Sequence, residues 1–518
     1  MAHRRSKSIS VALVLLLAAS SASFAGSDRA TVHTGEVQGK TEGAIVAFKG
    51  IPFAAPPVGE LRWKPPQPVQ PWSGVRSATT YGADCMQEPF PGDAAPLGVT
   101  PAEDCLYVNV WRPASDIKKA PVMVWIYGGG FVNGGSSPAV YDGSEFAKSG
   151  VVLVSFNYRL GNFGFFAHPA LSAEQPNELR GNYGLMDQLA ALQWVQRNIA
   201  AFGGDSGNVT IFGESAGGMS VNTLLTTPLA RGLFHKAVIE SGGGRSMMRS
   251  RKVQGGDDSA EAQGVRLAKH FGIEGNDAQA LAKLRAIPAD PLKLSMMRMS
   301  DPNYSGGPMF DGKVVVGEPA KLFAEGKGAP VPVMLGATNS DIGFPQAKSL
   351  DELYALFGDK AAAARAAYPS NGNDFVQVYM RVGGDQMMVE PARYIARVLT
   401  ARGQPAYHFR FSYVAESMRQ SWPGAPHATE IPYVFNTVAA RYGKDLTAKD
   451  AAMARTVHEY WVTFAKDGKP RAKGAPAWEP YDAKRDAIMD FTNEGPMVRP
   501  DPWKVRLDLA EGLHASRE

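Results

Sequence analysis

The sequence has no long apolar run and no excess of charge of either sign. Its 54 Lys and Arg residues nearly balance its 50 Asp and Glu residues, which argues against a nucleic-acid-binding protein with a basic surface. The longest wholly apolar run has nine residues, Val11–Ala19, whereas a helix that spans a bilayer needs roughly 20. We therefore expect neither a nucleic-acid partner nor a membrane anchor.

Cysteine is also scarce, because Cys85 and Cys105 are the only two in 518 residues. A lone pair without further clustered ligands does not have the pattern of a metal site, so we expect no metal. In an exported protein such a pair is typical of a disulfide. The alternative is two buried free thiols.

Residues 1–25 differ in composition from the rest of the chain. A basic start at residues 3–7 precedes the apolar run, and Ser23-Phe24-Ala25 supplies the small residues that a signal peptidase requires. We expect a signal peptide that is cleaved near Ala25 and a mature protein that is secreted or periplasmic. A membrane anchor is the weaker alternative, since the apolar run is too short.

The remainder, residues 26–518, has the pattern of one α/β domain. Apolar residues recur at helical spacing over Leu185–Ile199, between segments that are typical of strands buried on both faces. Strand, helix and strand in this order predict a mostly parallel central sheet flanked by helices. The stretches at about 245–310 and 345–400 are more helical, and we expect them to be insertions packed over the active site. The expected strands are Val122–Tyr127, Val151–Phe156, Val209–Phe212 and Val331–Leu335.

A serine flanked by small residues follows the third of these strands. The pentapeptide Gly213-Glu214-Ser215-Ala216-Gly217 has the form G-x-S-x-G, and the residues after it can begin a helix. Such a strand-turn-helix junction holds a nucleophilic hydroxyl above the sheet and directs helix N–H groups toward it. The alternative is an ordinary turn in which Ser215 caps the helix.

Three glycines directly follow the first expected strand. Backbone N–H groups at Gly129 and Gly130 can approach a ligand closely, and together with the N–H of Ala216 they would form an oxyanion hole with three donors. A triple glycine alone is more often a flexible turn. Its position after one strand of the sheet that carries the G-x-S-x-G turn favours the catalytic interpretation.

His427 is the candidate base among nine histidines. In chains with a G-x-S-x-G turn the acid and then the histidine follow the serine, and His427 lies in a loop late in the sequence. The others lie near the termini, ahead of the expected acid, or on apolar strands and helices: His3, His33, His168, His235, His270, His408, His458 and His514.

At this point the chain resembles the type-B carboxylesterases, an α/β-hydrolase family that includes cholinesterases, bacterial esterases and fungal lipases. The resemblance covers nearly the whole mature chain. The motifs that carry it are Gly50–Gly59, Glu103–Asn109, Trp125–Phe131, Asn157–Arg159, Phe202–Asp205 and Phe212–Gly218.

The resemblance implies a serine esterase that needs no cofactor and acts on a small-molecule ester. It implies that Ser215 is the nucleophile and His427 the base. It further implies an oxyanion hole formed by Gly129, Gly130 and Ala216. It also implies a disulfide between Cys85 and Cys105.

The third member of the triad departs from the family pattern. The family usually has a glutamate directly before a glycine, but here Ile342 occupies that place and Asp341 is the only acid in the stretch. We hypothesise that Asp341 orients His427. The alternatives are a neighbouring acid, Glu240 or Asp351, or a site of serine and histidine alone.

The residue before the nucleophile has two possible roles. Glu214 is either a buried acid that orders water and the histidine or a structural hydrogen-bond partner.

The sequence does not identify the substrate. No Trp lies between the two cysteines, so a choline ester is not the expected substrate. An amidase or lipase-like hydrolase would use the same triad, and a non-catalytic binding module would share the fold. Candidates for the pocket wall are Phe131, Phe163, Phe165, Phe166 and Phe344.

Overall fold

The computed structural model describes residues 27–90, 92–174, 176–245, 253–294, 296, 306–370 and 374–515. The expected signal peptide lies outside these residues and stays a prediction, as does the single-domain boundary. Part of the expected insertion at about 245–310 also lies outside them.

One large sheet organises the described part of the chain. Its eleven strands lie in the order β14-β13-β12-β11-β10-β9-β7-β8-β6-β4-β3. Seven neighbouring strands pair in parallel: β13, β12, β11, β10, β9, β7 and β8. The strands next to them on both sides, β14 and β6, pair antiparallel. The sheet is therefore the mostly parallel α/β sheet that the sequence predicted.

The strands of this sheet are β3 (Lys40–Glu42), β4 (Ile45–Pro52), β6 (Tyr107–Pro113), β7 (Ala120–Ile126), β8 (Val152–Phe156), β9 (Gly204–Glu214), β10 (Lys236–Glu240), β11 (Val333–Thr338), β12 (Ala406–Phe411), β13 (Ala487–Thr492) and β14 (Gly495–Pro500). A second, small sheet contains β1 (Arg29–Val32), β2 (Gly35–Gln38) and β5 (Val75–Ser77). Every residue of β8, β10, β11 and β12 is buried. Burial on both faces explains the near-continuous apolar runs of β8 and β11, whereas β10 and β12 also contain charged residues.

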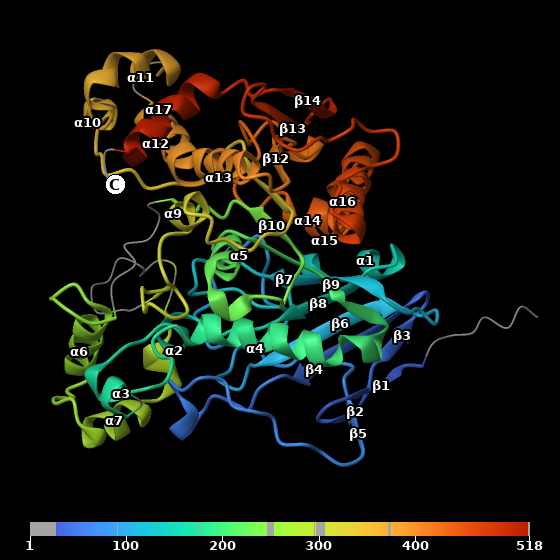
Figure 1. The fold of residues 1–518 in the computed structure, drawn as a ribbon, viewed down its shortest axis with the longest axis vertical. Coiled ribbons are helices and arrows are strands. Elements are labelled where there is room, and N and C mark those ends of the chain that lie inside the picture. The colour runs from blue at the N-terminus through green and yellow to red at the C-terminus, as the bar shows by residue number, and fades with distance from the viewer. Residues whose placement is uncertain are drawn as a thin grey trace, which may run out of the picture.

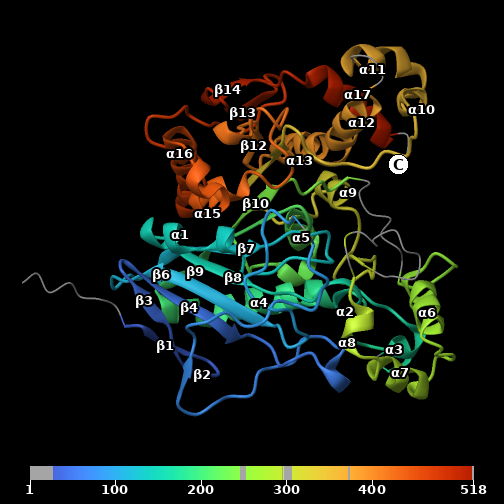
Figure 2. The same ribbon diagram turned by 180° about the vertical axis from the view of Figure 1, so that it is seen from behind.

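Helices cover the sheet, and α4 is the longest of those on the face turned to the viewer in Figure 1. Figure 2 shows the same helix behind the central strands. The helix spans Tyr183–Asn198 and continues as one 3₁₀ turn, and the helical segment ends at Gly203, which has a φ of 80°. The left-handed conformation at Gly203 ends the helical segment because glycine adopts it without a Cβ clash.

The other helices have these bounds: α1 Ser144–Lys148, α2 Gly161–Gly164, α3 Pro169–Glu174, α5 Ala216–Thr226, α6 Ala260–His270, α7 Ala278–Arg285, α8 Ala289–Leu292, α9 Pro319–Ala324, α10 Leu350–Ala355, α11 Ala361–Ala367, α12 Phe375–Gly384, α13 Glu390–Ala401, α14 Ile431–Val434, α15 Val438–Tyr442, α16 Ala448–Asp467 and α17 Lys504–Ala515. A π-helical turn at Asp385–Val389 joins α12 to α13. Helices α10, α11, α12 and α17 gather at one end of the molecule, whereas α6 and α7 lie at the other (Figure 1).

The direction of the parallel strands places the candidate residues together. The carboxyl ends of parallel strands meet at one edge of a sheet, where α/β proteins bind their ligands. Gly128 follows β7, Ser215 follows β9, Ser241 follows β10, and Asp341 lies three residues after β11. The loop that carries His427 comes after β12 and reaches the same edge through a bridge between Ser340 and Pro426.

Candidate active site

Ser215 lies at a strained junction between β9 and α5. Its φ is 56°, a conformation that costs a non-glycine residue on the order of 1–3 kcal/mol and is common at functional sites. The glycines beside it are required, because a Cβ at Gly213 or Gly217 would lie 2.6 Å or 1.9 Å from the Ile126 carbonyl oxygen. The Ser215 N–H donates to the Glu240 carbonyl oxygen at 2.9 Å. The turn therefore holds its serine in one fixed orientation.

Asp341 contacts His427 directly, with 2.6 Å between Asp341 Oδ1 and His427 Nδ1. The second carboxylate oxygen of Asp341 accepts hydrogen bonds from Ser241 Oγ at 2.7 Å and from the Thr338 N–H and hydroxyl at 3.1 Å and 3.0 Å. The Ile342 N–H donates to Oδ1 at 2.8 Å. These donors fix the carboxylate, which in turn fixes the imidazole ring.

The surroundings of Asp341 favour its ionised form. Burial alone would raise its pKa, but the charge of His427 and the hydrogen-bond donors outweigh burial and hold the pKa below its usual value. Among the described residues, neither rival acid forms a hydrogen bond or ion pair with His427. Glu240 Oε1 accepts from Trp461 Nε1 at 2.8 Å, and the Asp351 side chain is 89% exposed and pairs with Arg365.

The other nitrogen of His427 faces Glu214. His427 Nε2 lies 3.2 Å from Glu214 Oε1, and among the described residues no hydrogen bond joins Nε2 to the Ser215 hydroxyl. Burial raises the pKa of Glu214 well above its usual range. Burial alone would lower the pKa of His427, but the carboxylates of Glu214 and Asp341 outweigh it and raise the pKa to about 10. The protonation states of Glu214 and His427 therefore depend on each other.

The glycines after β7 present free N–H groups at the same edge. Gly129 and Gly130 have φ values of 104° and 60°, and a Cβ at Gly129 would lie 2.1 Å from the Asn133 carbonyl oxygen. Among the described residues no hydrogen bond uses the N–H of Gly129, Gly130 or Ala216. Ala216 is the first residue of α5, where backbone N–H groups have no partner within the helix.

A cavity of about 470 Å³ opens onto these groups. Its lining includes Ser215, His427, Glu214 and the glycines 128–130, and the rest is mainly apolar. Phe131 and Phe344 line it, and Phe344 is 64% exposed. The other three phenylalanines considered from the sequence are buried in the core and are not part of this lining: Phe163, Phe165 and Phe166.

Several residues at this edge could not be assigned from the sequence. Ser241 directly follows β10 and bonds to Asp341, but an isolated serine after a strand is too common to indicate a role. Glu430 lies three residues after His427, is fully buried, and has two carboxylate oxygens without a hydrogen-bond partner. The expected disulfide between Cys85 and Cys105 is present, with an S–S distance of 2.03 Å.

Within the described residues there is no cluster of three His, Cys, Asp or Glu side chains that could hold a metal ion. No helix among them has the length and apolarity to cross a membrane.

A parallel sheet with a strained serine turn, a buried Asp-His pair and a glycine loop at one edge defines an α/β-hydrolase. The comparison with protein families agrees, because the carboxylesterase family matches residues 27–370 and 359–506. The chain belongs to the carboxylesterase family, whose enzymes hydrolyse carboxylic esters.

Individual relatives support the same assignment. The fumonisin B1 esterase of Sphingopyxis macrogoltabida is 36% identical over 481 residues, which cover 89% of this chain and 86% of that protein. The para-nitrobenzyl esterase of Bacillus subtilis (strain 168) is 36% identical over 486 residues, with 89% and 94% covered. A solved structure of a PNB esterase superposes with a TM-score of 0.79 at 32% identity and covers 93% of this chain and 99% of that chain.

Proposed function

We propose that this protein is an exported serine carboxylesterase that cleaves its substrate through an acyl-enzyme on Ser215. The observation that carries the proposal is the 2.6 Å contact between Asp341 and His427, beside a cavity that His427 and Ser215 both line. Ser215 attacks the ester carbonyl while His427 takes its proton, and Asp341 holds the ring in the tautomer whose Nε2 is free for this transfer.

The negative charge on the carbonyl oxygen is stabilised by the N–H groups of Gly129, Gly130 and Ala216. Each such donor contributes on the order of 3–4 kcal/mol to the transition state. His427 then passes its proton to the departing alcohol, and a water molecule repeats the sequence on the acyl-enzyme. These steps use side chains and N–H groups of the chain, the ester and a water molecule.

Glu214 stabilises the positive charge that forms on His427 during the reaction. Its carboxylate oxygen lies 3.2 Å from Nε2, so it stabilises the imidazolium that forms when His427 takes the serine proton. Glu214 is therefore a positioning and electrostatic residue rather than a proton acceptor from Ser215.

The cavity favours an ester with an apolar acyl or alcohol group. Apart from the polar groups around Ser215, its walls contain Met219, Ile342, Phe344, Met387 and Met388. Methionine side chains adapt to irregular ligands. The relatives named for a para-nitrobenzyl ester and for fumonisin B1 support a substrate that is larger than a simple acetate ester.

Hydrolysis of p-nitrophenyl esters by residues 26–518 tests the proposal. We expect turnover by the parent chain and a loss of several orders of magnitude in Ser215→Ala. Ser77→Ala, which changes an exposed serine on β5, is the matched control. A fluorophosphonate label that attaches to the parent chain but not to Ser215→Ala would identify the nucleophile. A folded, inactive and unlabelled parent chain would support a non-catalytic binding module instead.

The composition of residues 1–25 supports the proposal of export, as does the disulfide, since disulfides persist in oxidising compartments. Amino-terminal sequencing of protein recovered outside the cytoplasm tests it. We expect the mature chain to begin near Gly26, and an intact amino terminus on cytoplasmic protein would contradict the proposal.

A further inference from the structure

The direction of the two glycine donors depends on the carbonyl groups that precede them. A peptide group is planar and trans, so the N–H of Gly129 lies in one plane with the C=O of Gly128. The N–H of Gly130 likewise lies in one plane with the C=O of Gly129. In a trans peptide the C=O and N–H groups point in opposite directions. The contacts that fix these two carbonyl groups therefore also fix the directions of the two N–H groups.

The segment that follows the glycines binds one of these carbonyl groups and packs against the other. The N–H groups of Val132 and Asn133 each donate to the Gly129 carbonyl oxygen at 3.0 Å. Gly134 packs on the other carbonyl, because a Cβ at this position would lie 2.6 Å from the Gly128 oxygen. With a φ of 110° and no side chain, Gly134 brings its backbone against the peptide that carries the first donor.

Gly134 is in turn bound by Gln87, a residue 47 positions away in the sequence. Gln87 Nε2 donates to the Gly134 carbonyl oxygen at 2.6 Å, and the Gly134 N–H donates to Gln87 Oε1 at 2.8 Å. The amide also donates to the Cys85 carbonyl oxygen at 2.9 Å. Gln87 is 2% exposed, and the disulfide of Cys85 ties its loop to the start of β6. One buried amide thus satisfies both backbone groups of Gly134.

We propose that Gln87 is a positioning residue of the oxyanion hole, which acts through Gly134 on the N–H groups of Gly129 and Gly130. The inference rests on the proposed function of these glycines and extends it to a side chain that does not touch the substrate. The disulfide-closed loop, residues 85–105, then serves catalysis by anchoring the amide of Gln87.

The expected size of the effect follows from what misplacement of a donor costs. Loss of one oxyanion donor lowers kcat by about 10²–10³-fold, and a displacement of about 1 Å costs about 10²-fold. Release of Gly134 moves both donors without removing them, so we expect kcat to fall about 10- to 100-fold. KM should stay within about threefold, because the donors are aimed at the transition state.

Gln87→Met is the variant that isolates this effect. Methionine has a similar length but cannot form the three hydrogen bonds of the amide. The segment keeps a separate anchor, since the Ser136 N–H donates to Asp84 Oδ1 at 3.1 Å. Should Gln87→Met fail to fold, Gln87→Glu retains the acceptor for the Gly134 N–H and removes only the donors. Thr100→Ala, an exposed position in the same loop, is the matched control.

The readout combines kcat and KM for a p-nitrophenyl ester with inhibition by an alkyl trifluoromethyl ketone. Addition of the Ser215 oxygen to this ketone forms a hemiketal whose oxyanion lies in the same hole, while His427 takes the proton. We expect the inhibition constant of Gln87→Met to rise by about the factor by which kcat falls, with no change in Thr100→Ala.

Two results would overturn the inference. One is a Gln87→Met variant with kcat within about twofold of the parent chain; the other is a lower kcat with an unchanged inhibition constant. In both cases an inactive Ser215→Ala would leave the proposed function standing. A parent chain that turns over no faster than Ser215→Ala would refute the proposed function and this inference together.

Discussion

At the scale of single residues, His427 lies between two carboxylates that differ in their surroundings. Asp341 is surrounded by hydrogen-bond donors that hold its pKa below the usual value. Glu214 has one oxygen without a hydrogen-bond partner in a buried position, and burial raises its pKa. Asp341 thus serves as the constant charge, whereas the charge of Glu214 depends on its buried surroundings and on His427.

Asp341→Asn should lower kcat by about 10³–10⁴-fold while the protein stays folded. The amide that replaces the carboxylate no longer selects the Nδ1–H tautomer, so Nε2 is not available as a base. Asp351→Asn is the matched control, because its side chain is 89% exposed. Steady-state kinetics on a p-nitrophenyl ester measure both. Near-parental turnover in Asp341→Asn would assign the role to another acid.

Glu214→Gln should shift the titration of His427 to lower pH. The His427 pKa is raised to about 10, and Glu214 is the first charge responsible. Without that charge the imidazolium is less stable, so the ring loses its proton at a lower pH. The histidine resonances in NMR report this, with the other histidines as internal references and His427→Gln for assignment. An unchanged midpoint of the His427 titration would mean that Glu214 does not supply the negative charge that raises the His427 pKa.

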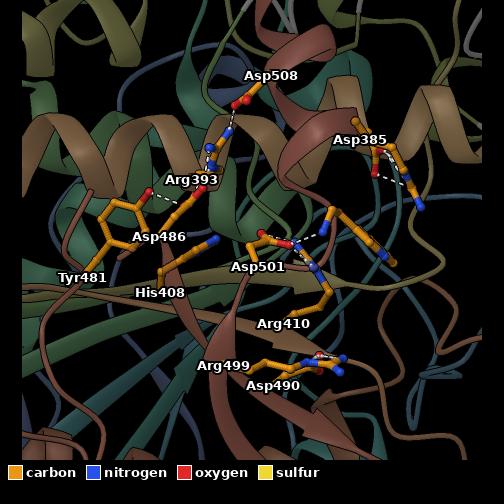
Figure 3. A network of polar contacts seen from close by, with 12 residues as sticks. Asp385, Arg393, His408, Arg410, Tyr481, Asp486, Asp490, Arg499, Asp501 and Asp508 are labelled. Atoms are coloured by element: carbon orange, nitrogen blue, oxygen red, sulfur yellow. Dashed lines mark hydrogen bonds and ion pairs between the residues drawn. The ribbon is translucent and has the colours of Figure 1, made fainter. Parts of the chain in front are cut away.

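At the scale of elements, ion pairs join α13 to α17 and to the residue before β13, and join β12 to the residue after β14. Figure 3 shows Arg393 between Asp486 and Asp508, and Arg410 facing Asp501. Arg393 Nη1 lies 2.8 Å from Asp508 Oδ1, and Arg410 donates to both oxygens of Asp501 at 2.8 Å and 2.7 Å. The pairs of Arg393 tie α17 to α13, and the buried pair of Arg410 ties the end of β14 to β12, the strand that leads to the loop of His427.

Arg410→Met should therefore lower the free energy of unfolding by about 3–5 kcal/mol. The Arg410 and Asp501 side chains are 2% and 0% exposed, so the substitution leaves a buried carboxylate without its counter-charge. Arg471→Met removes an exposed i,i+4 pair with Asp467 and should cost less than about 1 kcal/mol. Chemical denaturation measures both. Equal losses in the two variants would show that burial does not decide the energy of these pairs.

The elements also show what the sequence could predict. The turn at Ser215 was predictable because its requirements are local: a strand, a helix start and glycines where backbone atoms approach closely. The central strands were predictable because both of their faces are buried. Their order in the sheet is a long-range property, however, and it decides which loops meet. No local pattern could show that Gln87 binds Gly134, or that Glu430 is buried without a partner.

At the scale of the whole molecule, buried acids set the response of stability to pH. Burial raises the pKa of both Glu240 and Glu430 to about 8. The folded protein keeps these protons between the ordinary glutamate pKa and about pH 8, whereas the unfolded chain releases them near the ordinary value. Because the folded state binds more protons in this range, the free energy of unfolding falls as pH rises through it.

Glu430→Gln should flatten this decline, since a glutamine neither ionises nor loses a proton. One pKa unit corresponds to about 1.4 kcal/mol, so the raised pKa of Glu430 amounts to a few kcal/mol when its titration is complete. We expect the variant to match the parent chain near pH 5 and to exceed its unfolding temperature at pH 9. Thermal unfolding at both pH values measures the difference, with Glu274→Gln, an exposed position, as the control. An equal decline of the unfolding temperature in all three proteins would contradict this prediction. It would show that the folded protein stabilises the ionised Glu430 as well as water does in the unfolded chain.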